Sequence, residues 1–278
     1  MKTKIALVGA GGKMGMRCTQ NLVKSSDYDT GFIEISPAGI GRLADLGVVV
    51  SEPGDLLPEA DLVILAVPDN AMRAVSAEVI PQLKAGAIVV ILDPAAPLAG
   101  HLPMRPALSY YVTHPSHPSV FNWENTEAAQ RDYYGGMLAR QTVVSALMQG
   151  PEAHYSVGDA LTKVLFQPVT TNHRITVEQM AILEPGFSET LSSTCIKKIR
   201  EALDVVVEKG VPREAARDFI LGHINIQLAV LFDELPIQFS DAAIKALERA
   251  ESILFKDDWR KIFEMDNIHE QIEAITSK

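Results

Sequence analysis

A short apolar run that ends in a cluster of glycines constrains this chain more than any other stretch. The run is Ile5–Val8, and a helix-like segment follows the glycines over residues 16–24. Glycines at this spacing let the chain turn tightly, approach a pyrophosphate and pack a helix against a strand. The helix N-terminus adds free N–H groups for phosphate oxygens. The stretch predicts a dinucleotide-binding loop, whose cofactor-binding residues are Gly9, Gly11, Gly12, Lys13, Met14 and Gly15.

The spacing departs from the simplest fingerprint, and a second feature supports the prediction. A strict G-x-G-x-x-G would need glycine where Met14 stands, so the fit is G-x-x-G-x-x-G. The next strand-like run carries Glu34, close to the spacing of about 20 residues expected for an acid that bonds the adenine ribose 2′-OH. A carboxylate there repels a 2′-phosphate, which favours NAD over NADP. The alternative is a structural turn followed by an exposed glutamate at a strand end.

The first part of the chain alternates short apolar runs with helix-like segments. This pattern is typical of a doubly wound parallel sheet, in which continuous apolar strands are covered on both faces. We therefore predict an α/β Rossmann domain over residues 1–122. The predicted strands are Ile5–Val8, Phe32–Ile35, Val48–Val50, Leu62–Val67, Ile88–Leu92 and Tyr110–Thr113.

After residue 122 no run indicates a further strand. Helical spacing, interrupted by proline and glycine, predicts an all-helical (all-α) domain over residues 123–278 that serves substrate binding and dimerisation. The predicted helices are 126–149, 153–166, 175–209, 213–234, 241–255 and a stretch from 257 onward.

Charge and hydropathy limit the kinds of molecule that this protein is expected to bind. The net charge is −10, which argues against nucleic acid or an anionic membrane surface. No apolar run approaches the roughly 20 residues of a membrane span. The first strand begins within four residues of the start, so we expect no signal peptide. The two cysteines, Cys18 and Cys195, form no metal or redox motif, and we expect a cytoplasmic protein that binds a small molecule.

Ligands of such a sheet bind beyond the C-terminal ends of its strands. The fourth predicted strand runs into Val67, Pro68 and Asp69, which we expect to line the cofactor. The sixth ends in a segment where both His114 and His117 precede proline, so we expect an extended, stiff loop. An imidazole can take a hydroxyl proton as hydride leaves, and the spacing also permits joint metal ligation. The alternative is a pair of strand-end histidines that cap a surface.

Three residues further along are candidates for the same site. Glu184 falls on the flank of an apolar helical stripe, where a partly buried carboxylate needs a partner or a function. It is a candidate catalytic residue or metal ligand, with a structural ion pair as the alternative. His223 and Arg174 are candidate substrate-binding residues. Their alternatives are a core histidine and a surface arginine.

The order of these pieces resembles the superfamily of 6-phosphogluconate and 3-hydroxyisobutyrate dehydrogenases. The likeness rests on the Gly12–Gly15 loop and on a helical second domain. Those enzymes carry a catalytic lysine on the first long helix of that domain. Here the corresponding stretch, Val177–Pro185, contains no lysine, and the next one is Lys197. Decarboxylation assisted by that lysine is therefore not expected.

A more specific likeness is to the D-apionate oxidoisomerase family. It implies NAD-dependent oxidation of a branched sugar acid, D-apionate, followed by a 1,2-shift to 3-oxo-isoapionate. It implies His114 or His117, together with Glu184, as base and acid, with a divalent metal on His114 and Glu184 by analogy with ketol-acid reductoisomerases. The wider superfamily implies a homodimer. The alternatives are a β-hydroxyacid dehydrogenase without rearrangement and a non-enzymatic NAD sensor. The matching segments are Gly9–Gly15, His114–Pro118, Ala146–Glu152, Val177–Pro185 and Leu221–Asn225.

Overall fold

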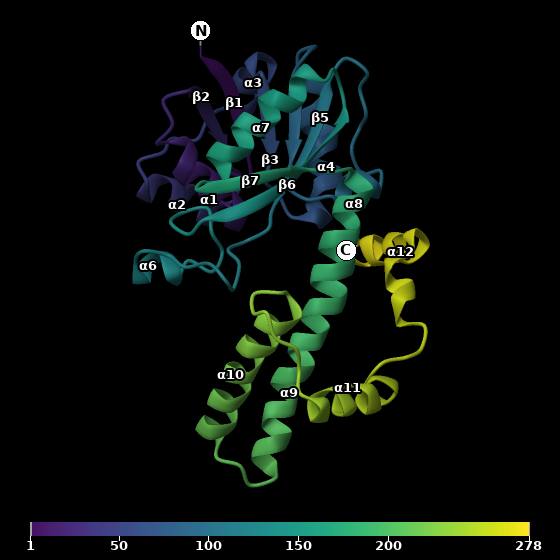
Figure 1. Ribbon diagram of the computed structural model, residues 1–278. Helices are drawn as coiled ribbons and strands as arrows, with labels where there is room; N and C mark the ends of the chain where they lie inside the picture. The colour runs from purple at the N-terminus through teal and green to yellow at the C-terminus, as the bar shows by residue number, and fades with distance from the viewer. Residues whose placement is uncertain (1, 278) are drawn as a thin grey trace. The chain divides into compact units, whose positions relative to one another are not determined.

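The computed structural model describes residues 2–277 and contains one seven-stranded sheet (Figure 1). The strand order is β2-β1-β3-β4-β5-β6-β7. Neighbouring strands are parallel except β5 and β6, which pair antiparallel. The strands are β1 (Thr3–Val8), β2 (Tyr28–Ile33), β3 (Leu62–Leu65), β4 (Ile88–Ile91), β5 (Ser109–Pro115), β6 (Gln141–Gln149) and β7 (Val169–Arg174).

Helices cover both faces of this sheet, which confirms the doubly wound prediction (Figure 1). Alternate residues of β1, β3 and β4 enter two separate apolar cores, one on each face. One core includes residues of α4 and α8, and the other includes residues of α1, α2 and α7. The helices are α1 (Lys13–Leu22), α2 (Pro37–Asp45), α3 (Pro53–Leu56), α4 (Asp69–Val79), α5 (Ala95–Leu98), α6 (Glu127–Gln130), α7 (Ala153–Leu165) and α8 (Val177–Ala181).

The prediction that only helices follow residue 122 is wrong for β6 and β7. In β6 the buried Val143 and Ala146 belong to the apolar cores on opposite faces of the sheet, but the polar Thr142 and Ser145 interrupt the apolar run. β7 is an edge strand of mostly polar residues, so it lacks the apolar run that marked the other strands. The predicted strand Val48–Val50 is reduced to a single bridge between Val50 and Phe32. The sheet therefore continues past the division expected at residue 122.

By its contacts the chain forms two compact units, and the second comprises Gly186–Ile268. A π-helix, Ile182–Ser193, precedes α9 and contains Pro185, which has no N–H to donate. The helices predicted from residue 153 onward are otherwise confirmed. The remaining elements are α9 (Thr194–Glu208), α10 (Arg213–Leu231), α11 (Asp241–Leu254), a 3₁₀ turn (Trp259–Phe263) and α12 (Met265–Thr276).

The helices of the second unit bury little of their apolar surface. α9 and α11 contain no buried residue, and in α10 only Ala216 is buried. A groove of about 570 Å³ runs along α9 and α10, with Ile199, Val206 and Phe219 in its lining. Throughout residues 2–277 no helix combines the length and the apolar character needed to cross a bilayer.

Candidate active site

The glycine loop packs so closely that side chains are excluded. Gly9 has φ +80°, a backbone conformation that favours glycine. A Cβ on Gly15 would lie 2.0 Å from the Gly9 carbonyl oxygen, so α1 can approach the loop only with glycine there. Gly12 precedes the first residue of α1 as its N-cap. The loop therefore presents the N-terminus of α1 at the C-terminal end of β1, where a pyrophosphate would bind.

Glu34 lies just beyond β2 and contacts the loop directly. Its Oε2 accepts the Gly11 N–H at 2.9 Å. Its Oε1 accepts the Ile35 N–H, and both the N–H and the hydroxyl of Ser36. Burial raises the pKa of this carboxyl, but these hydrogen bonds outweigh it, so the pKa is lowered overall. Glu34 is thus a fixed anion beside the phosphate loop.

A cleft of about 190 Å³ lies at the C-terminal ends of the central strands. It joins the glycine loop to the histidine segment, as the sequence predicted for ligands of a parallel sheet. Val67, Pro68 and Asp69 line it after β3, in the place expected of them. Its other lining residues are Lys13, Met14, Leu65, Ala66, Met72, Leu92, Asp93 and His114.

His114 meets two carboxylates at this cleft. Its Nδ1 lies 2.9 Å from the Leu92 carbonyl oxygen, which can only accept, so a neutral ring carries its proton on Nδ1. The same Nδ1 is 3.7 Å from Asp93 Oδ2. One ligand atom from each of Asp93, His114 and Glu184 lies within 4.8 Å of the others. Two carboxylates and an imidazole form a donor set that suits a divalent cation.

The structure confirms that Glu184 is partly buried, but its place beside the apolar stripe was predicted with the spacing of an α-helix, which does not hold here. Glu184 lies in the π-helix, whose wider turn changes the angle between successive side chains. Asp93 was not among the predicted site residues. The signal was present, because Asp93 follows β4 after Leu92, much as Asp69 comes shortly after the end of β3.

Asp69 lies in the cleft close enough to Asp93 for the two carboxylates to repel each other. Burial, followed by the nearby Asp93 carboxylate, raises the pKa of Asp69 to about 6, although His114 and His101 lower it. A carboxyl whose ionisation is opposed by a neighbouring acid lies in a field that favours a bound cation.

His117 is near His114 but its backbone differs from the prediction. The two rings lie edge to face with centroids 6.4 Å apart. His117 Nδ1 is 2.8 Å from the Tyr134 carbonyl oxygen and therefore donates to it. Its φ is +62°, so the expectation of an extended residue before Pro118 is wrong here. A non-glycine residue with a left-handed backbone is strained by about 1–3 kcal/mol, and residues strained in this way are found mostly at functional sites.

Arg174 and His223 have other neighbours in the structure. Arg174 pairs with Glu152 through both guanidinium nitrogens and lies 4.1 Å from the centroid of the Tyr155 ring. This supports the alternative of a structural surface arginine. His223 is exposed on α10, where its ring stacks on Phe219 and its Nδ1 lies 2.8 Å from the Phe219 carbonyl oxygen. The alternative of a core histidine is therefore wrong within this chain.

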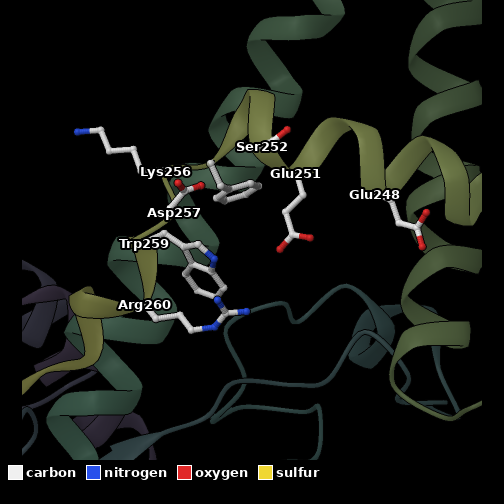
Figure 2. Close-up of a pocket in the computed structure, with 8 residues that line it drawn as sticks. Glu248, Glu251, Ser252, Lys256, Asp257, Trp259 and Arg260 are labelled. Carbon is white, nitrogen blue, oxygen red and sulfur yellow. The ribbon is translucent and has the colours of Figure 1, made fainter.

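The helical unit has a hollow of its own, of about 270 Å³, at the end of α11 (Figure 2). Arg260 lies over the Trp259 ring at 4.7 Å, and Glu248, Glu251 and Asp257 also line the hollow. No predicted site residue is among its lining residues. We therefore take the cleft beside the glycine loop as the candidate active site.

Two family models match the chain. Residues 4–97 match the NAD-binding domain of 6-phosphogluconate dehydrogenase. Residues 122–276 match the C-terminal domain of phosphogluconate dehydrogenase (decarboxylating). Together the two matches confirm the resemblance to the 6-phosphogluconate dehydrogenase superfamily and the NAD-binding fold.

Curated relatives and a solved structure match over the full length. A D-apionate oxidoisomerase of Cupriavidus necator is 51% identical, with 99% of this chain and 100% of the relative covered. One from Rhizobium rhizogenes is 50% identical, with 99% and 100% covered. A crystal structure of a semialdehyde dehydrogenase NAD-binding protein from Cupriavidus necator, in complex with calcium and NAD, has a TM-score of 0.97. It is 51% identical, with 99% of this chain and 100% of that chain covered.

Proposed function

Because the chain belongs to the D-apionate oxidoisomerase family, we propose that it converts D-apionate to 3-oxo-isoapionate. It is an NAD-dependent oxidoreductase. The observation that carries the proposal is the cleft in which the glycine loop, Asp93 and His114 meet. In this cleft a dinucleotide and a small sugar acid could contact each other.

The cofactor is held by the glycine loop and by Glu34. The N–H groups at the start of α1 bind the pyrophosphate, with the Lys13 ammonium at its side. Glu34 accepts a hydrogen bond from the adenine ribose. The four N–H and O–H groups that already donate to Glu34 fix the orientation of its carboxylate for this contact. Val67, Pro68 and Asp69 line the path towards the nicotinamide. Bound NAD⁺ supplies the hydride acceptor for the oxidation.

A divalent cation is held by His114 and Glu184, and we add Asp93 to this set. The fit rests on the 4.8 Å cluster of donor atoms, and the Asp93 carboxylate of this cluster also contributes, after burial, to the raised pKa of Asp69. The similar crystal structure contains calcium together with NAD. Such an ion, when bound, polarises a ketone and stabilises a developing alkoxide.

His117 is the base for the alcohols, because its donation to Tyr134 O from Nδ1 leaves the lone pair of a neutral ring on Nε2. In the oxidation the carbinol carbon next to the carboxylate loses hydride, and its hydroxyl proton passes to the imidazole. After the imidazole has released this proton to solvent, it takes the proton of the neighbouring tertiary hydroxyl. A hydroxymethyl group moves from that carbon to the new ketone carbon. The carbon that loses this group becomes the ketone of the product, and the alkoxide formed on the former ketone carbon takes the proton back from the imidazolium.

We further propose that the protein is a cytoplasmic homodimer. The apolar side chains exposed on α9 and α10 form a surface that a second copy would cover, among them Ile196, Phe219 and Leu231. Light scattering should give twice the mass of one chain at micromolar concentration, and a monomer would refute this. The two free cysteines, of which Cys18 is buried, are compatible with a reducing compartment.

The test combines cofactor reduction with product structure. The protein is incubated with NAD⁺ and D-apionate, NADH is followed by absorbance, and the product is analysed by NMR. NADH with a rearranged carbon skeleton is the expected result. An unrearranged 2-oxo acid would refute the isomerase step and leave a simple dehydrogenase. No NADH with D-apionate or with a panel of related sugar acids would favour an NAD-binding sensor.

The cation site is tested by Glu184→Gln with Glu178→Gln as its matched control. Both glutamates lie in the same helical segment, but Glu178 is exposed on α8 and lies outside the cluster. Titration calorimetry with Ca²⁺ and Mn²⁺ should show affinity about ten-fold or more weaker for Glu184→Gln only. Equal affinities in the two variants would contradict the assignment.

A further inference from the structure

We infer that Tyr134 is a positioning residue that ties the base His117 to the start of the dinucleotide-binding helix α1. The inference rests on the proposed function, in which His117 accepts the substrate protons. Tyr134 lies in the connection between β5 and β6, far in sequence from the glycine loop. Its side chain contacts α1 and its backbone contacts His117, so one residue joins the cofactor side of the site to its base.

The side chain of Tyr134 contacts two cations of α1. The guanidinium carbon of Arg17 is 3.9 Å from the ring centroid, and the Lys13 ammonium is 4.5 Å from it. Lys13 also donates a hydrogen bond to the Tyr134 hydroxyl. Cation–π contacts of this kind contribute attraction on top of the packing. Lys13 is the first residue of α1 and lines the cleft, so its ammonium group is near both Tyr134 and the expected phosphate position.

The backbone of Tyr134 fixes the imidazole of His117. Its carbonyl oxygen accepts the Nδ1–H at 2.8 Å, and the two rings lie edge to face at 5.4 Å. This hydrogen bond selects the tautomer with its lone pair on Nε2, which a base requires. The backbone of His117 is strained at φ +62°, so it must be held by its surroundings, and this hydrogen bond is one of the contacts that hold it.

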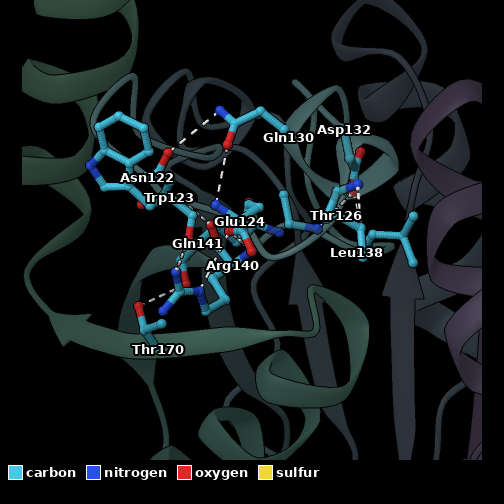
Figure 3. Close-up of polar contacts among 12 residues, drawn as sticks. Asn122, Trp123, Glu124, Thr126, Gln130, Asp132, Leu138, Arg140, Gln141 and Thr170 are labelled. Carbon is cyan, nitrogen blue, oxygen red and sulfur yellow. Dashed lines mark hydrogen bonds and ion pairs between the residues drawn. The ribbon is translucent and has the colours of Figure 1, made fainter.

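The loop around Tyr134 is held by contacts that do not involve its side chain. Asp132 accepts the N–H groups of Gly135, Leu138 and Ala139 at 3.1, 2.8 and 3.2 Å. Figure 3 shows the contact between Asp132 and Leu138. Asn21 of α1 donates to the Gly136 carbonyl oxygen at 2.6 Å. Removing the Tyr134 ring should therefore loosen one anchor of the loop without unfolding it.

This arrangement predicts a link between cofactor occupancy and the order of the loop. A bound pyrophosphate restrains the Lys13 ammonium, and Lys13 restrains Tyr134. Hydrogen–deuterium exchange of peptides covering residues 131–140 should slow about three-fold or more when NAD⁺ is added to the wild-type protein. Tyr134→Ala should abolish this protection. The readout needs no substrate and no turnover.

The variants are Tyr134→Ala and Tyr134→Phe, with Tyr133→Ala as the matched control, since the Tyr133 side chain is 78% exposed. Tyr134→Ala should lower kcat about ten-fold while the Kd for NAD⁺ changes less than about three-fold, because a displaced base slows the chemical step. Tyr134→Phe keeps the ring over both cations and should recover most of kcat.

The inference is overturned if Tyr134→Ala matches Tyr133→Ala in both kcat and NAD⁺-dependent protection. It is also overturned if the Kd for NAD⁺ rises more than about ten-fold at unchanged kcat, since Tyr134 would then serve the cofactor rather than the base. Failure of the proposed function is distinct, because the wild-type protein itself would then produce no NADH from D-apionate. The exchange comparison would still test the link in that case.

Discussion

Gly15→Ala should abolish tight NAD⁺ binding although it adds a single methyl group. The new Cβ would lie 2.0 Å from the Gly9 carbonyl oxygen and 2.9 Å from the Ala10 carbonyl carbon and oxygen, whereas ordinary contacts begin near 3.4 Å. All three atoms belong to the backbone, so no side chain can rotate away. The first turn of α1 must withdraw from the loop by more than an ångström, which moves its N–H groups away from the phosphate position.

The size of the effect follows from the hydrogen bonds that are lost. One bond between an N–H and a charged group contributes about 1.5–3 kcal/mol, so losing one raises the Kd about ten- to hundred-fold. The overpacking itself should lower the free energy of unfolding by about 1–3 kcal/mol. The Kd is measured by NADH fluorescence titration, and stability by thermal melts of the cofactor-free protein.

Gly41→Ala is the matched control, because Gly41 lies in α2 and a Cβ there meets nothing within 4 Å. It should leave the Kd unchanged and stabilise the protein by about 0.5–1 kcal/mol through helix propensity. The steric argument is refuted if folded Gly15→Ala binds NADH within about three-fold of the wild-type affinity.

Three further predictions concern single side chains of the first unit. Glu34→Ser should lower the preference for NAD over NADP by about ten-fold or more in kcat/KM, and an unchanged preference would contradict its role at the ribose. Asp69→Asn should raise the free energy of unfolding at pH 8, because burial and the Asp93 carboxylate raise the pKa of Asp69 and so penalise its ionised form in the folded state. The gain over the wild-type protein should shrink as the pH falls below 6 and the Asp69 carboxyl becomes protonated. A gain that is constant with pH in denaturant titrations would refute this. Arg174→Ala should keep kcat/KM for the sugar acid within about two-fold of the wild-type value, since the Arg174 guanidinium is already paired with Glu152. A large rise in KM would instead indicate that Arg174 binds the substrate.

The sequence predicted the parts of the fold that depend on continuous apolar runs. β3 and β4 consist of buried residues throughout, because both of their faces are covered. β6 and β7 lie towards one edge of the sheet and mix polar with apolar residues, so their composition resembles that of an amphipathic helix or a loop. The local spacing of apolar residues could not distinguish a strand from a helix or loop here, since the pairing of β6 with β5 decides that it forms a strand.

The candidate site was predictable as far as it depends on strand ends. The glycine loop, Asp69 and His114 each follow or end a recognisable strand, and the structure brings them to one cleft. The position of Glu184 depends on a π-helix beside Pro185, for which the sequence offers only the proline. The left-handed backbone of His117 has no local signal at all, because the following proline favours the opposite conformation.

The scarcity of buried residues on α9, α10 and α11 has a consequence for how the chain folds. A helix of this length is marginally stable in water unless it packs, and these three bury one alanine between them. In the proposed homodimer part of their folding free energy comes from association, so it depends on protein concentration. Urea unfolding of the wild-type protein should show two transitions, of which the one reporting on residues 186–268 moves to lower urea on dilution. The sheet, which encloses its own core, should unfold at a midpoint that does not change with concentration.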